Sequence, residues 1–335
     1  MKYDLKKIKS YELKLSVTLD KTDLDYYVSE SEKRLANDLR LKGFRKGKAP
    51  PEIAKNKLNK KEVLETAFDF ALRQSFADVL IKEKIELIST ENLQVKENSL
   101  EKLVYSISLI TFPEFKLADY HNIPVEKKEV SVSDQEVDQT LEFLRKSRTN
   151  DNGSPELNDD FAKNLGQFNS LRELKNSVSD GLKQEKETRE SKRIQSTVLD
   201  KVAGNTKIEV PPLLIERQLD QMMLDLDADL HRQGLELGLF LAKINKSQDQ
   251  LRGQWKAKAE ILVKKALVLK EIAKIENIKV ESEEVKEKIN GLLQNFTGLE
   301  QVEKNTDLPK LTDQIHQILL NEKVLAFLEK GAGSD

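Results

Sequence analysis

Residues 42–50 read KGFRKGKAP, a stretch with four cations, two glycines, one phenylalanine and a closing proline. No acidic residue occurs between Asp38 and Glu52. Glycine permits backbone angles that other residues avoid, and proline is well suited to the first turn of a helix. The stretch therefore predicts a glycine-hinged loop that ends one helix, opens the next, and presents its ring and cations outward.

The sequence on both sides of this loop predicts a small α+β domain. Apolar and polar residues alternate from Leu13 to Leu19, as in a half-buried strand. The expected elements in chain order are a strand over 8–19, a helix from residue 22, a helix over 51–84, and strands near 93–96 and 103–112. Because strands and helices are mixed in this way, we expect one α+β domain over residues 1–112.

Helical patterns dominate the rest of the chain, after an extended segment over 122–130. Ser133 and Ser170 each begin a capping box, which marks a helix start. Expected helices cover residues 133–148, 170–203, 212–233, 247–276, 282–296 and 309–330. The helix over 170–203 would be about 50 Å long at 1.5 Å per residue. The expected parts are a linker with a first helix over 113–149, a short turn over 150–156, and an extended, mostly α-helical domain with long arms over 157–335.

Composition narrows the classes of function. The chain has 335 residues and no cysteine, which excludes disulfides, thiolate metal sites and cysteine catalysis. Its N-terminus lacks the apolar core of a signal peptide, and no apolar run reaches the roughly 18 residues of a membrane span. The first 60 residues carry 16 Lys and Arg against 9 Asp and Glu. We therefore expect a cytoplasmic protein whose basic end meets a partner.

Motifs for chemistry are missing from the sequence. His121, His231 and His316 share no ligand spacing, and no nucleophile–base set or glycine-rich nucleotide loop is found. The sequence therefore predicts no metal, no cofactor and no enzymatic activity.

The loop itself allows two interpretations. It could be a solvated basic turn, or it could be a docking tip in which cations contact phosphate or acidic groups and the ring supplies an anchor. The candidate docking residues are Lys42, Gly43, Phe44, Arg45, Lys46, Gly47 and Lys48.

Residues 43–50, GFRKGKAP, resemble the ribosome-docking signature of the trigger factor family of bacterial chaperones. The resemblance continues in family order through the linker segments 112–115 (FPEF) and 123–126 (IPVE), the segment 157–166 and the arm segment 210–234. It implies an ATP-independent chaperone that docks at the nascent-chain exit. Phe44, Arg45 and Lys46 would then contact a ribosomal protein and ribosomal RNA, unfolded or nascent chains would be the clients, and the free protein would form a homodimer.

One departure from the family pattern is large. Family members usually carry a prolyl isomerase domain between the linker helix and the re-entry segment, whereas here only eight residues separate Arg148 from Leu157. The resemblance therefore implies a family version without this domain and without its enzymatic activity.

An apolar stripe in the arm segment also allows two interpretations. It could be an ordinary core stripe between helices, or an adaptable wall for unfolded segments, to which flexible methionine is suited. The candidate client-binding residues are Met222, Met223, Leu226, Leu230, Leu239 and Phe240.

Three other functions remain open at the level of sequence. The chain could be a prolyl isomerase, an RNA-binding protein that uses its basic end, or a holdase or scaffold that works without the ribosome. The missing isomerase domain argues against the first of these.

Overall fold

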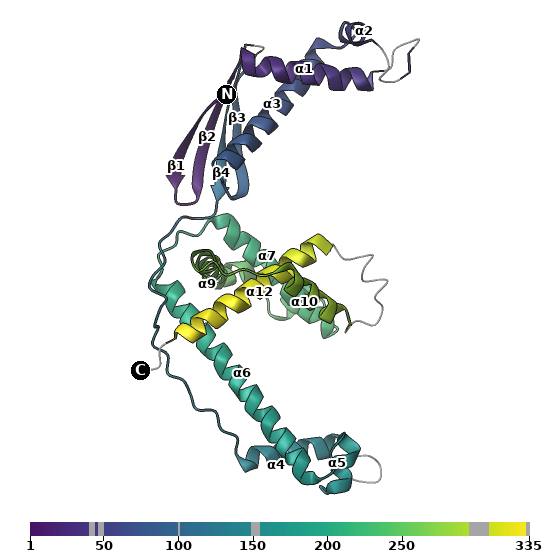
Figure 1. Ribbon diagram of the computed structural model, residues 1–335, viewed down its shortest axis with the longest axis vertical. Coiled ribbons are helices and arrows are strands. Elements are labelled where there is room, and N and C mark those ends of the chain that lie inside the picture. Colours follow the sequence, from purple (N-terminus) through teal and green to yellow (C-terminus); the bar gives the residue numbers. More distant parts are fainter. Residues whose placement is uncertain (40–43, 46–49, 100, 149–154, 295–307, 333–335) are drawn as a thin grey trace. The chain divides into compact units, whose positions relative to one another are not determined.

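The computed structural model describes residues 1–39, 44–45, 50–99, 101–148, 155–294 and 308–332 (Figure 1). The chain divides into two compact units. The first unit comprises Met1–Phe115 with Ile208–Val263, and the second comprises Lys116–Lys207 with Lys264–Asp335. Most of the predicted turn over 150–156 lies outside the described residues.

The first 115 residues form an antiparallel sheet with helices, here called the head. Its elements are β1 (Lys2–Lys9), β2 (Glu12–Asp20), α1 (Lys21–Asp38), α2 (Pro51–Lys55), α3 (Lys60–Lys82), β3 (Leu87–Asn98) and β4 (Lys102–Thr111). The strand order is β1-β2-β4-β3, and every neighbouring pair is antiparallel. The two central strands, β2 and β4, therefore carry most of the sheet's buried face.

The head core lies between the sheet and helices α1 and α3. Leu15 of β2 pairs with Ile107 of β4, and Val17 pairs with Tyr105, so apolar side chains of both strands face the same layer. Tyr105 is completely buried, and its hydroxyl lies 2.9 Å from Ser75 Oγ on α3. Burial raises the pKa of Tyr105. The polar tip of this large ring is thus satisfied inside the core.

Two predictions for the head were wrong in detail. The sequence did not predict β1, whose lysines obscure the alternation of Tyr3 and Leu5. The helix predicted over 51–84 is two helices, because the side chain of Asn59 accepts a hydrogen bond from the backbone N–H of Lys61 and starts α3.

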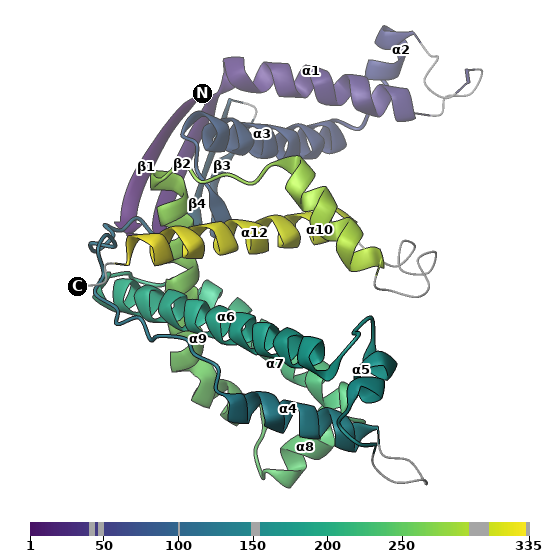
Figure 2. The same cartoon turned by 60° about the horizontal axis from the view of Figure 1, so that its bottom comes forward.

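The remaining elements are all helical. They are α4 (Asp134–Ser147), α5 (Asp159–Leu165), α6 (Leu171–Asn205), α7 (Pro212–Arg232), α8 (Leu237–Lys243), α9 (Gln248–Ile275), α10 (Ser282–Gln294) and α12 (Leu308–Gly331). Figure 2 labels all of them, and Figure 1 labels all but α8 from another direction. The fold class is therefore confirmed: an α+β region is followed by a mostly helical one.

Local signals explain several helix ends. Ser133 and Glu136 form the predicted capping box at the start of α4, and Ser170 Oγ accepts from the backbone N–H of Glu173 at the start of α6. Gly234 ends α7 with a φ of 73°, a conformation that glycine adopts without steric cost. Helix α5 was not predicted as a separate element, although Asn158 caps it through the backbone N–H of Phe161.

Candidate functional site

The loop quoted first joins α1 to α2, and these two helices form its stem. Lys55 Nζ on α2 lies 2.8 Å from Glu32 Oε2 on α1. Next to it in sequence, Ala54 is 1% exposed. An ion pair therefore joins the two helices that flank the loop, and α2 is buried next to this pair.

Phe44 and Arg45 are the two candidate docking residues that the structure describes, and both are exposed. The Phe44 side chain is 42% exposed, although a ring of this size is usually buried. The other candidate docking residues, Lys42, Gly43, Lys46, Gly47 and Lys48, lie outside the described residues. The structure therefore places an exposed aromatic ring beside an exposed guanidinium group at this position.

The cations on the neighbouring helix α1 already have partners. Lys33 Nζ donates to Glu30 at 2.6 Å, and this hydrogen bond raises the pKa of Lys33. The guanidinium of Arg34 lies 4.2 Å from the centroid of the Phe70 ring. These contacts hold Lys33 and Arg34 on the stem, so the charge at the tip comes from the loop.

The second candidate surface lies on the arm formed by α7, α8 and the first part of α9. Ile215, Leu219 and Ala259 are buried together, with Trp255 packed against them. Arg252 on α9 donates to Asp220 at 2.6 Å and to Glu216 at 2.7 Å on α7, and these two bonds raise its pKa.

The predicted client residues divide between core and surface. Met223 and Leu230 are each 5% exposed, in accordance with the packing interpretation that the sequence left open. Leu239 on α8 is 65% exposed, and the remaining three are half-buried: Met222, Leu226 and Phe240. The structure thus brings an accessible apolar edge next to a packed stripe.

Sequence reasoning missed Leu224 on this arm, which is 63% exposed, whereas it considered Leu235, which is 45% exposed, as part of an apolar run that could be either buried or exposed. Leu224 lies off the stripe that begins at Leu219, so helical periodicity places it on the outer face. An apolar residue on the polar face of an amphipathic helix is the signal that could have identified it.

Two classes of site find no support within the described residues. No group of three or more histidine, aspartate or glutamate side chains is placed to hold a metal ion. No described helix is both long enough and apolar enough to cross a membrane.

Comparison with known proteins gives consistent matches along the chain. The family model described as "Bacterial trigger factor protein (TF)" matches residues 1–144, and the model of its C-terminus matches residues 170–330. A trigger factor of Clostridium kluyveri is 23% identical over 423 aligned positions, covering 98% of each chain. A trigger factor of Clostridium botulinum (strain Loch Maree) is 24% identical, covering 92% of this chain and 93% of the relative.

The alignment with the Clostridium kluyveri protein is longer than this chain, 423 positions against 335 residues, so that relative has residues with no counterpart here. A solved structure of the trigger factor chaperone, described for promiscuous substrate recognition in folding and assembly, matches with a TM-score of 0.59. It is 18% identical, covering 98% of this chain and 99% of the other, which supports the fold. Because models of one family match both its N-terminal and its C-terminal parts, the chain belongs to the bacterial trigger factor family.

Proposed function

We propose that the chain is an ATP-independent chaperone that docks beside the ribosomal exit and shields apolar segments of new proteins. The trigger factor family implies a ribosome-associated chaperone. The observation that carries the proposal here is the exposed Phe44–Arg45 pair on a loop with a fixed stem. Exposed aromatic and arginine side chains are the residue types that most often dominate protein interfaces.

In this proposal the docking loop makes two kinds of contact, one through its cations and one through its aromatic ring. The cations Arg45 and Lys46 contact ribosomal RNA phosphates and acidic groups of a protein at the exit, whereas Phe44 fills an apolar pocket. Gly43 and Gly47 give the backbone conformational freedom, and Lys42 and Lys48 add charge. The ion pair between Lys55 and Glu32 supports this role, because a fixed stem reduces the entropy lost on docking.

Clients bind the arm through small, separated apolar patches. Leu224, Leu235 and Leu239 supply exposed surface, and half-buried Met222, Leu226 and Phe240 extend it. Burying about 100 Å² of apolar surface contributes only about 2.5 kcal/mol before entropy costs. Such patches bind many sequences weakly and release them without nucleotide.

The proposal assigns no enzymatic step to the chain. Residues 1–112 form the ribosome-binding domain, 113–149 the linker and first helix, and 157–335 the chaperone domain. Residues 150–156 replace the isomerase domain with a short connection. The protein acts in the cytoplasm and forms a homodimer when it is not on the ribosome.

Four assays separate this function from its rivals. The chain should suppress aggregation of an unfolded test protein without ATP, and it should pellet with purified ribosomes. It should leave the isomerisation rate of a proline peptide unchanged, since a higher rate would restore the enzyme hypothesis. Binding to naked RNA that is as tight as ribosome binding, and falls steeply with salt, would favour the RNA-binding alternative.

A further inference from the structure

Residues 116–132, here called the strap, cross the second unit without forming a helix or a strand. Within the described chain, no main chain–main chain hydrogen bond holds this segment. Buried polar main-chain groups need partners, so the contacts of the strap require another source. Side chains of α6 provide most of them.

The contacts follow one direction along α6. Lys201 donates to the carbonyl oxygen of Pro124 at 2.7 Å, Arg193 to that of Glu126 at 2.6 Å, and Lys186 to that of Ser131 at 2.7 Å; the N–H of Lys128 donates to Glu190 at 2.8 Å. Near the end of α6, the Thr206 hydroxyl accepts from the N–H of Ala118 at 3.1 Å. As the strap advances, its partners move back along the helix, so the two segments are antiparallel.

The lengths of the two segments agree. From Pro124 to Ser131 an extended chain covers about 22 Å at about 3.2 Å per residue. From Lys201 back to Lys186, α6 also covers about 22 Å at 1.5 Å per residue. The strap is therefore almost fully extended along α6, the conformation in which each main-chain group is accessible to a neighbouring surface.

Only a few strap side chains are buried. Tyr120, Ile123 and Val125 are 9%, 9% and 5% exposed. The Tyr120 hydroxyl also donates to Glu276 at 2.6 Å, and burial together with this bond raises its pKa to about 12. By contrast, the side chains at 126–129 are exposed. The rest of the second unit thus contacts the strap through three strap side chains and through the main chain of the strap.

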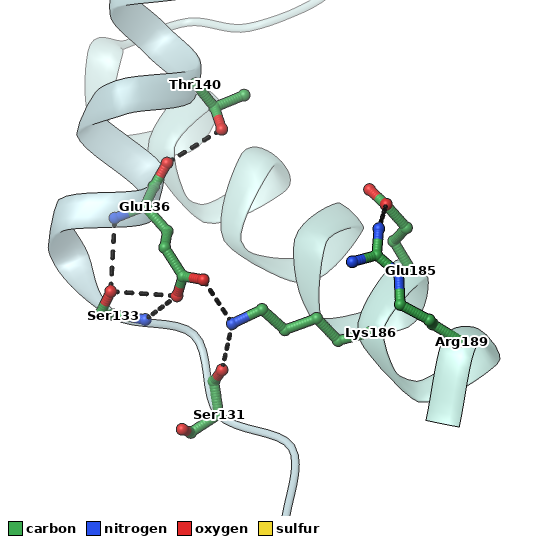
Figure 3. Close-up of polar contacts among 7 residues, drawn as sticks. All are labelled: Ser131, Ser133, Glu136, Thr140, Glu185, Lys186 and Arg189. Carbon is green, nitrogen blue, oxygen red and sulfur yellow. Dashed lines mark hydrogen bonds and ion pairs between the residues drawn. The ribbon is translucent and has the colours of Figure 1, made fainter. Parts of the chain in front are cut away.

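The end of the strap is fixed by one ammonium group (Figure 3). Lys186 Nζ binds the Ser131 carbonyl and lies 2.6 Å from Glu136 Oε1. The same Glu136 carboxylate accepts from Ser133 at the start of α4. One helix side chain therefore joins strap and capping box, whereas Arg189 nearby pairs with Glu185 on its own helix.

We propose that the strap-facing side of α6 is a second polypeptide-binding site, occupied in cis by the strap, whose competing occupant is an extended segment of an unfolded protein. Recognition through main-chain carbonyl and amide groups does not depend on sequence, and the apolar anchors are common in unfolded chains. The inference rests on the proposed chaperone function and specifies where and how part of the client is held.

The first test releases the strap and leaves α6 intact. An Ile123→Asp, Val125→Asp variant removes two anchors, and hydrogen exchange at residues 118–131 should accelerate. Affinity for a permanently unfolded, carboxymethylated test protein should rise, by about tenfold if the strap is detached about a tenth of the time. Arg189→Ala, which removes a cation of α6 that does not contact the strap, should leave both readouts unchanged.

The second test removes the α6 side chains that donate hydrogen bonds to the main-chain carbonyl groups of the strap. A Lys186→Ala, Arg193→Ala, Lys201→Ala variant should also free the strap but show no gain in affinity. Because the chain has no cysteine, a photo-crosslinker on Thr197→Cys, one turn from both Arg193 and Lys201, can report what covers this face. It should crosslink the test protein in the strap-released background and the strap otherwise.

Three results would overturn the inference: unchanged client affinity in the Ile123→Asp, Val125→Asp variant although its strap is released, unchanged hydrogen exchange at residues 118–131 in that variant, or crosslinks only to a second copy of the chain. Circular dichroism on each variant controls for loss of fold. If the parent chain fails to suppress aggregation at all, the proposed function itself fails, and this outcome differs from a parent that works but does not respond to strap release.

Discussion

Lys55 on α2 and Glu32 on α1 form an ion pair of 2.8 Å, which joins the two helices that carry the docking loop. Lys55 is 64% exposed and Glu32 21%, so we expect a coupling energy below about 1 kcal/mol in a double-mutant cycle. Each single alanine variant should nevertheless weaken ribosome binding about threefold, or ~0.6 kcal/mol, through a looser stem. Urea denaturation measures the coupling energy, and a ribosome-binding titration measures the affinity. Unchanged affinity in the single variants would show that this ion pair does not contribute to docking.

Two buried serines in the head should respond differently to replacement by alanine. Ser31 is fully buried and its hydroxyl has no hydrogen-bond partner, whereas Ser75 Oγ pairs with the Tyr105 hydroxyl. Ser31→Ala should therefore leave the free energy of unfolding equal or higher. Ser75→Ala should lower it by about 1–2 kcal/mol, because the buried Tyr105 hydroxyl loses its closest partner. Thermal or urea unfolding measures both, and destabilisation by Ser31→Ala would contradict the burial account.

The strap should become less protected in acid. Hydrogen bonds from Lys186 and then from the Ser133 N–H lower the pKa of Glu136 to about 2, and bonds from Arg193 and then from the Lys128 N–H do the same for Glu190. A carboxylate with a depressed folded-state pKa stabilises the fold above its unfolded pKa of about 4.5, and this contribution is lost as pH falls towards about 2.

Hydrogen exchange at residues 118–131, corrected for the intrinsic rate, should therefore show constant protection from pH 7 to about 5 and declining protection below about 4.5. Glu190→Gln should remove much of this dependence. Constant protection down to about pH 2 would show that the two carboxylates do not hold the strap.

Substitutions on the arm should affect client binding and folding stability separately. Leu224→Ser and Leu239→Ser change exposed side chains, so the free energy of unfolding should stay within about 0.5 kcal/mol while aggregation suppression weakens. Met223→Ala leaves a cavity at a buried position and should lower the free energy of unfolding by about 2 kcal/mol or more. Equal chaperone activity in the two serine variants would place the client surface elsewhere.

Periodicity and capping signals predicted most of the fold. The Ser133 capping box and Gly234 marked helix ends that the structure confirms. Strand β1 was missed because Lys6 and Lys7 interrupt its alternation, as is common at a sheet edge where charge prevents aggregation. The break before α3 depends on a single side-chain cap at Asn59, a local contact that the longer apolar pattern concealed.

The candidate surfaces were less predictable. The sequence predicted that the loop presents Phe44 and Arg45 outward, and both are exposed, but it could not show the ion pair between Lys55 and Glu32 that joins the flanking helices. How deeply the apolar stripe of α7 is buried depends on the neighbouring helix α9, whose Trp255 and Ala259 pack with it. The strap contacts join residues such as Lys201 and Pro124, which are far apart in the chain, and side chain–main chain contacts of this kind have no sequence period.

The central claim is tested most directly by the ribosome affinity of the chain and two triple variants. The tip variant is Phe44→Ala, Arg45→Ala, Lys46→Ala. The control, Ile81→Ala, Arg73→Ala, Lys61→Ala, removes the same kinds of side chain from α3, where Ile81 and Arg73 are each 76% exposed and Lys61 83%. The account predicts a loss of about tenfold or more, or ~1.4 kcal/mol, for the tip variant and parent-like affinity for the control. Equal affinity of the tip variant and the parent, with both folded, would contradict it.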